Sequence, residues 1–321
     1  MDVTVIATVV NEGEGLRPLL DSLINQTFYP KEIIICDGGS TDETLSILEE
    51  YKQYLPLKII VAPGSNISRG RNLAIQASTS PVIAVTDAGV VLAPDWLEEL
   101  VSPIVAGEAS TTSGWFEPDP YTDFEVVMGA TVLPALVDIK PEKFLPSSRS
   151  VAFLKGAWEE VGGYPEWLDY GEDLVFDKAL YEKYGPFTFV DRAIVYFRPR
   201  GNLRSFSRQY YLYARGDGKA NLWPKRHIIR YLVYLLGLPF ILRLIWRDKW
   251  PGWMLLLLGI GTYSRRPAER LWDSTWGWRP PSRVRAFALI PIIRFVGDLA
   301  KMIGYPVGLY WRWRNLDKIR G

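Results

Sequence analysis

Residues 82–96, VIAVTDAGVVLAPDW, carry the strongest signal for the fold. Val82–Val85 is a continuous apolar run of β-branched and small residues, typical of a strand that is buried on both faces. Asp87 and Gly89 follow this run, and Pro94 then opens a helix. Because open α/β sheets bind ligands at the carboxyl ends of their parallel strands, Asp87 is the first candidate site residue.

The preceding segments repeat this alternation of an apolar run and an amphipathic helix. It predicts strands at 3–10, 32–36, 57–62 and 81–86, and helices at 13–26, 41–55, 68–78 and 96–105. Ser40 and Glu43 have the spacing of a capping box before the second helix. Further strands are predicted at 109–116, 151–154 and 187–197, and helices at 121–133, 157–161, 171–184 and 203–215. The pattern predicts an α/β fold, with a mostly parallel sheet and helices on both faces.

The composition excludes several protein classes. The single cysteine, Cys36, excludes a disulfide framework and is expected to be a small buried hydrophobe. Asp2, Glu12 and Glu14 interrupt any apolar run at the start, which argues against a secretory signal peptide.

The charge is distributed very unevenly along the chain. Residues 1–200 contain 15 Lys and Arg against 30 Asp and Glu, whereas residues 201–321 contain 22 against 6. Nine of the 13 tryptophans also follow residue 200, together with apolar runs such as 228–246. Basic residues and tryptophan at the ends of apolar runs favour a membrane surface, and nucleic acid would not require those runs. We therefore predict a body at 1–220 and a membrane-associated helical region at 221–321, as either a spanning hairpin or interfacial helices. The alternative for this region is a helical subdomain of a soluble protein.

Five motifs occur in a fixed order at predicted strand ends or helix starts. They are TVVNEGEGL at 8–16, DGGSTDET at 37–44, GRN at 70–72, VTDAG at 85–89 and GEDL at 171–174. In this order they resemble the family 2 glycosyltransferases of GT-A-type fold, over roughly the first two thirds of the chain. The resemblance implies a nucleotide-sugar donor and transfer of its sugar to an acceptor.

The resemblance also implies which residues bind the donor. By their motif positions these are Thr8, Val9, Glu12, Asp37, Gly38, Arg71, Asp87 and Ala88. Four of them have a purely structural alternative, which for Asp87 is that of a simple turn residue. Glu12 would suit a helix N-terminus, Asp37 could form an Asx turn with the glycines that follow it, and Arg71 could lie on a solvated helix face.

Asp87 corresponds to the first acid of the family's metal-binding motif. The family's usual second acid is replaced here by Gly89. A divalent cation can still bind through one carboxylate if phosphate oxygens and water complete its shell. We therefore expect Mg²⁺ or Mn²⁺ at Asp87, with arginine sharing the stabilisation of the leaving group.

Glu172 and Asp173 correspond to the acidic pair in which the family places its general base. An inverting transfer needs a carboxylate to take the proton of the attacking hydroxyl. We predict Asp173 as the base and Glu172 as a residue that positions the acceptor, with Asp169 and Asp177 as further candidates. The structural alternative is that two acids stabilise a helix N-terminus.

Two later residues are weaker candidates. Arg215, in RQYYLYARGDG, is a loose analogue of the family's arginine that contacts the donor diphosphate, and membrane contact is its alternative. His227 is the single histidine and opens an apolar run, so we expect it at the membrane interface.

Together these features predict an inverting glycosyltransferase at the cytoplasmic face of the cell membrane. Its predicted partners are a nucleotide-sugar donor, a lipid-linked or polysaccharide acceptor and membrane lipids, without nucleic acid. Two alternatives remain: a polyprenyl-phosphate glycosyltransferase, whose acceptor needs no strong base, and a non-catalytic membrane scaffold that keeps the nucleotide-sugar fold.

Overall fold

The computed structural model describes residues 1–320, which form two compact units. The first contains Met1–Asp119 and Leu136–Arg198, and the second contains Pro120–Ala135 and the chain from Pro199 onward. The sequence analysis placed a boundary at 220. The segment between Pro199 and that position is grouped with the second unit because it packs along a helix of the C-terminal region.

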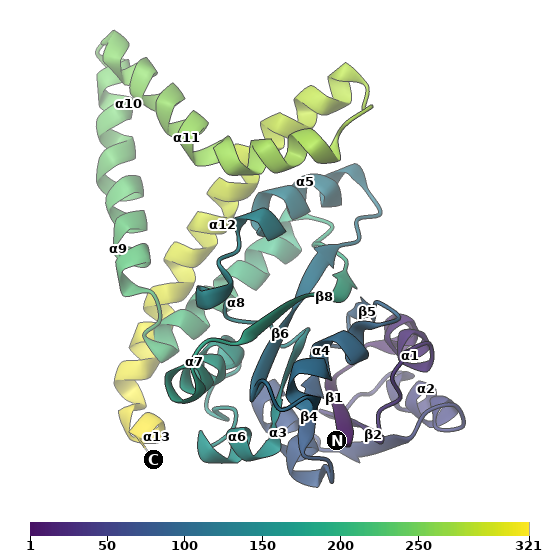
Figure 1. The fold of residues 1–321 in the computed structure, drawn as a ribbon. Helices are drawn as coiled ribbons and strands as arrows, with labels where there is room; N and C mark the ends of the chain where they lie inside the picture. Colours follow the sequence, from purple (N-terminus) through teal and green to yellow (C-terminus); the bar gives the residue numbers. More distant parts are fainter. Residues whose placement is uncertain (321) are drawn as a thin grey trace. The chain divides into compact units, whose positions relative to one another are not determined.

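The first unit is built on one eight-stranded sheet (Figure 1). Its strands are β1 (Val3–Val9), β2 (Glu32–Asp37), β3 (Leu57–Val61), β4 (Val82–Val85), β5 (Val90–Leu92), β6 (Thr111–Pro118), β7 (Val151–Leu154) and β8 (Thr188–Phe197). The strand order is β3-β2-β1-β4-β7-β6-β8-β5. The first four of these strands run parallel, and β7 then pairs antiparallel with β4. The short strand β5 was not predicted.

Helices cover both faces of this sheet, which confirms the predicted fold class. The helices of the first unit are η1 (Gly13–Leu16), α1 (Arg17–Ile24), α2 (Thr44–Tyr51), α3 (Ile67–Ala77), α4 (Trp96–Val105), η2 (Leu136–Asp138), η3 (Pro141–Lys143), α6 (Lys155–Glu160) and α7 (Glu172–Tyr184). Alternate side chains of β1 enter two different cores: Val5 packs with α1, α2 and α4, and Ile6 packs with α3, α6 and α7. This division follows from the two-residue repeat of a strand.

The predicted capping box at Ser40 and Glu43 is wrong. The Ser40 hydroxyl instead accepts the backbone N–H of Asn11 at 2.8 Å, and Glu43 makes no side-chain cap of α2. Thr44 Oγ1 accepts the N–H groups of Glu12 and Gly13, both at 2.9 Å. These polar residues therefore join the loops after β1 and β2 at the carboxyl edge of the sheet, rather than capping a helix.

The second unit consists of helices. They are α5 (Asp123–Val132), α8 (Leu203–Ala220), α9 (Pro224–Leu232), the π-helical η4 (Val233–Gly237), α10 (Leu238–Trp246), α11 (Trp250–Ser274), α12 (Pro280–Arg314) and α13 (Leu316–Arg320). Gly304 and Gly308 of α12 lie so close to α8 that an added Cβ would meet its backbone oxygens at 2.2 and 2.1 Å. This contact needs glycine, and Gly218 of α8 faces α12 equally closely. The close packing explains why α8 continues through the Gly216–Gly218 segment, where the sequence predicted its end.

His227 is buried in the second unit, so the prediction of an interfacial histidine is wrong. Its ring stacks on Tyr305 at 3.7 Å between centroids, and its Nε2 lies 3.1 Å from an Asp217 carboxylate oxygen. Its Nδ1 lies 3.1 Å from Arg230. These partners come from α8, α9 and α12, because the polar first turns of α9 pack against the α8–α12 pair.

α9, η4 and α10 form an uninterrupted helical run, Pro224–Trp246 (Figure 1). Within the described residues it is the one helix long and apolar enough to cross a membrane, by length and composition. The π turn precedes Pro239, which lacks the N–H that a regular α-helix would use. Gly252 of α11 lies against α10, where an added Cβ would meet the Ile245 nitrogen at 2.8 Å, so α11 turns back tightly after Arg247–Lys249.

Candidate active site

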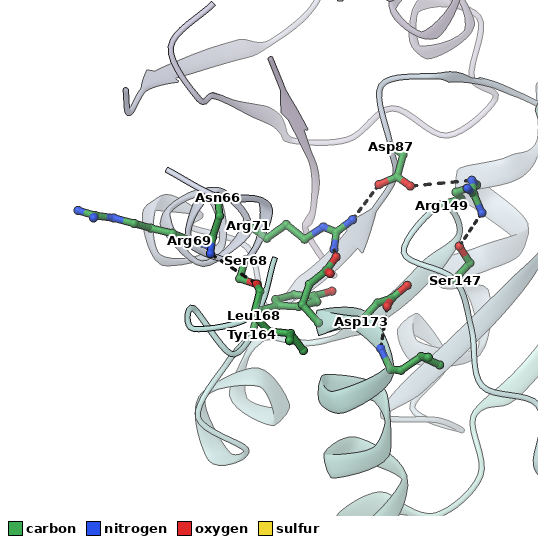
Figure 2. Close-up of polar contacts among 12 residues, drawn as sticks. Asn66, Ser68, Arg69, Arg71, Asp87, Ser147, Arg149, Tyr164, Leu168 and Asp173 are labelled. Carbon is green, nitrogen blue, oxygen red and sulfur yellow. Dashed lines mark hydrogen bonds and ion pairs between the residues drawn. The ribbon is translucent and has the colours of Figure 1, made fainter. Parts of the chain in front are cut away.

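Arg71 joins two of the predicted site segments (Figure 2). It extends from α3, is only 2% exposed, and donates from Nη1 to Glu172 Oε1 at 2.7 Å and from Nη2 to Asp87 Oδ1 at 2.8 Å. Asp87 follows β4, and Glu172 begins α7. The solvated alternative for Arg71 is therefore wrong: one buried guanidinium bridges carboxylates that are 85 positions apart in the sequence.

The ionisation of this group follows from burial and charge. Burial by itself would lower the pKa of the Arg71 guanidinium, but Asp87 and Glu172 raise it well above its usual value. Burial and the neighbouring Asp173 raise the pKa of Glu172 to about 7, while Arg71 opposes that shift. Burial also raises the pKa of Asp173, again against the effect of Arg71. The site therefore contains two adjacent carboxyl groups that hold protons more tightly than exposed acids do.

Asp173 differs from Glu172 in its contacts. Its Oδ1 accepts the N–H of Leu174 at 2.8 Å, a contact within the first turn of its own helix. Gly171 precedes the pair with φ +78°, a left-handed conformation that glycine adopts without strain. This turn directs the carboxylate of Glu172 toward Arg71 and leaves Asp173 half-buried beside it.

Arg149 is a residue of this site that the sequence analysis missed. Its Nε lies 3.9 Å from Asp87 Oδ2, its guanidinium covers the Phe197 ring at 4.6 Å, and it donates to Ser147 at 3.2 Å. It reaches Asp87 because β7 is antiparallel to β4, so that Val151 pairs with Val85. No sequence motif marked it. A basic residue directly before a buried apolar strand was the one available signal.

The segment before α7 is attached to α3 through polar side chains. The amide of Asn72 donates to the Tyr164 carbonyl at 2.8 Å, and its oxygen accepts the Tyr164 N–H at 2.9 Å. Asn66 and Ser68 donate to the carbonyls of Glu166 and Leu168 at 2.7 and 2.9 Å. Asn72 of GRN thus fixes Tyr164, and Asn66 and Ser68 fix residues 166 and 168. Arg71, beside Asn72, binds the two acids.

Asp37 forms the turn that was its structural alternative. Its Oδ2 accepts the N–H groups of Gly39 and Ser40, both at 2.9 Å, and its Oδ1 accepts the Ser40 hydroxyl. The side chain is fully buried. Gly38 beside it has no room for a Cβ, which would meet Val10 at 2.4 Å. Asp37 therefore shapes the carboxyl edge of β2 from within.

The remaining predicted donor residues lie along the same edge of the sheet. Val9 is buried and pairs in register with Asp37, and Thr8 is half-buried against Gly70 of α3. Glu12 is exposed after β1, and Ala88 is buried after Asp87. Arg215 belongs to α8 in the second unit, so its predicted contact with the donor remains a prediction.

The fit of a divalent cation depends on Asp87. No group of three or more His, Cys, Asp and Glu side chains that could hold a metal occurs within residues 1–320. Asp87 Oδ1 is engaged by Arg71, and Oδ2 faces Arg149 at 3.9 Å. One protein oxygen is consistent with Mg²⁺ or Mn²⁺ that takes its other ligands from phosphate and water. Gly89 is exposed, and an added Cβ would meet nothing within 4 Å.

Comparison with known proteins agrees with these observations. Residues 4–142 match the family described as Glycosyl transferase family 2. Glycosyltransferase AglE of Haloferax volcanii is 27% identical over 246 residues, which cover 74% of this chain and 79% of that protein. The uncharacterized glycosyltransferase YibD of Escherichia coli is 32% identical over 101 residues, which cover 31% of this chain and 29% of the relative. The match thus spans less than a third of the Escherichia coli protein.

A solved structure shows the same fold. It is the mannosyltransferase PcManGT from Pyrobaculum calidifontis in complex with GDP-Man and Mn²⁺, with a TM-score of 0.57 and 20% identity. The alignment covers 96% of this chain and 87% of that one. The matched segment and the similarity in fold point to the same family. The chain therefore carries a family 2 glycosyltransferase domain of GT-A-type fold.

Proposed function

We propose that this protein is an inverting glycosyltransferase that moves a sugar from a nucleotide diphosphate sugar to an acceptor hydroxyl. The observation that supports it best is the bridge from Arg71 to Asp87 and Glu172, which holds the end of β4 beside the start of α7. A leaving-group site at Asp87 and a base at Asp173 then belong to one site. Release of nucleoside diphosphate from UDP- or GDP-sugars, with an acceptor present, tests the proposal.

Asp173 is the base in this proposal. It takes the proton of the acceptor hydroxyl while that oxygen bonds to the anomeric carbon, and the bond from this carbon to the diphosphate breaks. Glu172 forms an ion pair with Arg71 at 2.7 Å, so its proposed role is to hold the guanidinium rather than to contact the acceptor. Burial raises the pKa of Asp173, so its carboxylate is a stronger base than that of an exposed aspartate.

The leaving diphosphate is proposed to lie at Asp87 and Arg149. A divalent cation bound there would offset the negative charge that develops on the diphosphate. Arg149 is 24% exposed at its side chain, and its guanidinium can donate to phosphate oxygens in a bidentate manner. Thr8, Val9 and Gly38 would line the nucleoside side, and Asp37 would keep their edge rigid.

We expect Asp87→Asn to abolish the Mn²⁺-dependent part of donor affinity, a loss of at least about tenfold. Asparagine keeps an oxygen for Arg71 but loses the charge that attracts the cation, so the fold should persist. Calorimetry with UDP- and GDP-sugars, with and without Mn²⁺, measures the effect. Asp95→Asn is the control, because Asp95 is exposed and only eight positions away. Unchanged Mn²⁺ dependence in Asp87→Asn would place the cation elsewhere.

The reverse substitution is available at Gly89. A Cβ added there meets no neighbour within 4 Å, and an aspartate restores the family's usual second acid. Gly89→Asp should therefore tighten Mn²⁺ binding in the presence of donor. Gly89→Asn, which adds similar volume without charge, should not. Equal effects of the two variants would contradict a cation beside this position.

We further propose that the protein acts at the cytoplasmic face of a membrane on a lipid-linked or polysaccharide acceptor. The support is the apolar surface of the helical run from α9 to α10 and the start of α11. Its exposed side chains include Leu235 (61%), Leu236 (64%), Phe240 (59%), Trp246 (88%), Trp250 (72%) and Leu257 (67%). Basic residues lie near both ends of this run, Lys225 and Arg226 at its start and Arg243 and Arg247 at its end. Such residues favour contact with the anionic lipids of the cytoplasmic leaflet.

The triple variant Leu235→Lys, Leu236→Lys, Phe240→Lys is expected to move the protein from the membrane to the soluble fraction. Lysine in the middle of a membrane helix costs about 3 kcal/mol per residue. The triple alanine variant at the same positions is the control, and vesicle flotation is the measurement. Deletion of the whole tail is a poorer test, because α12 forms part of the core of the second unit. Flotation of the lysine variant at the wild-type level would contradict membrane insertion here.

A further inference from the structure

Asp177 is a buried acid that the proposed reaction does not use. It lies on α7, one helical turn after Asp173, and its side chain is fully buried. Within the described residues, neither of its carboxylate oxygens has a hydrogen-bond partner. Positions four apart lie on the same face of a helix, so Asp177 sits directly behind the predicted base.

Its surroundings offer little that would stabilise a negative charge. The charged groups that act on it are Asp173, Arg71 and Glu172. Asp173 and Glu172 repel a carboxylate at position 177. Both Nη groups of Arg71 already donate, one to Asp87 and the other to Glu172. The ring of Tyr164 stacks on Phe176 at 4.1 Å, and the Tyr164 hydroxyl makes no hydrogen bond of ordinary geometry within residues 1–320.

An ionised carboxylate at such a position is expensive. Removing an unpaired charge from water costs far more than removing the neutral acid, so a buried group of this kind keeps its proton. Burial first, and then Asp173, raise the pKa of Asp177 well above its usual value, while Arg71 opposes the shift. The burial of Asp177, its lack of hydrogen-bond partners within the described part of the chain and the charges around it therefore all favour a protonated side chain.

We propose that Asp177 is a neutral carboxylic acid at neutral pH, so that Asp173 is spared the repulsion of a further negative charge and stays ionisable as the base. The role in catalysis rests on the proposed function, whereas the protonation itself does not. With Asp177 neutral, Arg71 and Arg149 face three carboxylates, those of Asp87, Glu172 and Asp173, which leaves one excess negative charge. An ionised Asp177 would make the excess two and raise the pKa of Asp173 further.

The first test is the pH dependence of stability in Asp177→Asn. An unfolded aspartate releases its proton above pH of about 4, but the native acid keeps it, so wild-type stability falls as pH rises. Asparagine has no such proton. The melting temperature of the variant minus that of wild type should therefore rise by roughly 2 °C per pH unit between pH 5 and 8. A difference that is independent of pH, or that falls with pH, overturns the proposal.

The matched control is Asp191→Asn, at an exposed position of β8. Its melting-temperature difference from wild type should not change with pH. If Asp177→Asn does not fold, infrared spectra of protein labelled with ¹³C-aspartate, in the Asp173→Asn background, answer the same question. A carboxylic-acid band at pH 8 supports the neutral acid, and its absence overturns the proposal.

The second test concerns catalysis. If Asp177 is neutral throughout, Asp177→Asn leaves the acid limb of the pH profile of kcat/KM within about 0.3 pH unit of wild type. If Asp177 is ionised, the substitution removes a negative charge next to the base and moves that limb to lower pH, which overturns the proposal. Absence of transfer activity in every variant and in wild type would refute the proposed function, while the melting experiment still decides the state of Asp177.

Discussion

Asp173→Asn is expected to lower kcat about 10³-fold while donor binding is retained. Asparagine preserves the contact with the Leu174 N–H through its oxygen but cannot accept the proton of the acceptor hydroxyl. The rate of nucleoside diphosphate release with acceptor measures kcat, and calorimetry measures donor binding. In wild type the rate should fall as the pH drops, because Asp173, whose pKa is raised by burial, then takes up a proton and can no longer act as the base.

Two controls separate the base from a general loss of structure. Asp191→Asn, at an exposed position of β8, should leave kcat unchanged. Glu172→Gln should lower stability as well as rate, because it removes a partner of buried Arg71. If Asp173→Asn retains most of its activity, an acceptor that needs no strong base becomes the better explanation. A polyprenyl phosphate is such an acceptor. Failure of the wild type to bind any nucleotide sugar would favour a non-catalytic scaffold.

Arg71→Met is expected to lower the free energy of unfolding by about 4 kcal/mol, because it leaves Asp87 and Glu172 without their shared counter-charge. This corresponds to a fall in melting temperature of roughly 6 °C. Methionine fills much of the volume, so the loss measures charge pairing more than packing. Denaturant unfolding, followed by circular dichroism, gives the free energy directly.

The control for this variant is Arg69→Met. Arg69 lies on the same helix but is exposed, so its replacement should change stability by less than about 0.5 kcal/mol. Arg71→Lys should resemble Arg71→Met rather than wild type, since an ammonium group cannot reach two carboxylates with fixed, divergent donors. Similar small effects at positions 69 and 71 would refute the bridge.

The linear order of apolar runs was sufficient to predict most of the fold. Val82–Val85 and the three runs before it form the parallel part of the sheet, and helices 67–77 and 172–184 lie close to their predicted bounds. These features depend on local periodicity, which a single sequence displays. Two details were missed or wrong because they depend on distant segments: β5 pairs with β8, and the Ser40 side chain bonds to the loop after β1.

Only part of the candidate site could be predicted from the sequence in the same way. The sequence by itself placed Asp87 and Glu172-Asp173 at strand and helix ends, because each follows a recognisable boundary. It did not show that Arg71 binds both acids, that Asp37 closes its own turn, or that Arg149 faces Asp87. The tertiary structure decided these points. They depend on the direction in which β7 pairs with β4 and on the packing of α3 against the segment before α7. Such pairings join residues that are far apart in the sequence, so no local pattern encodes them.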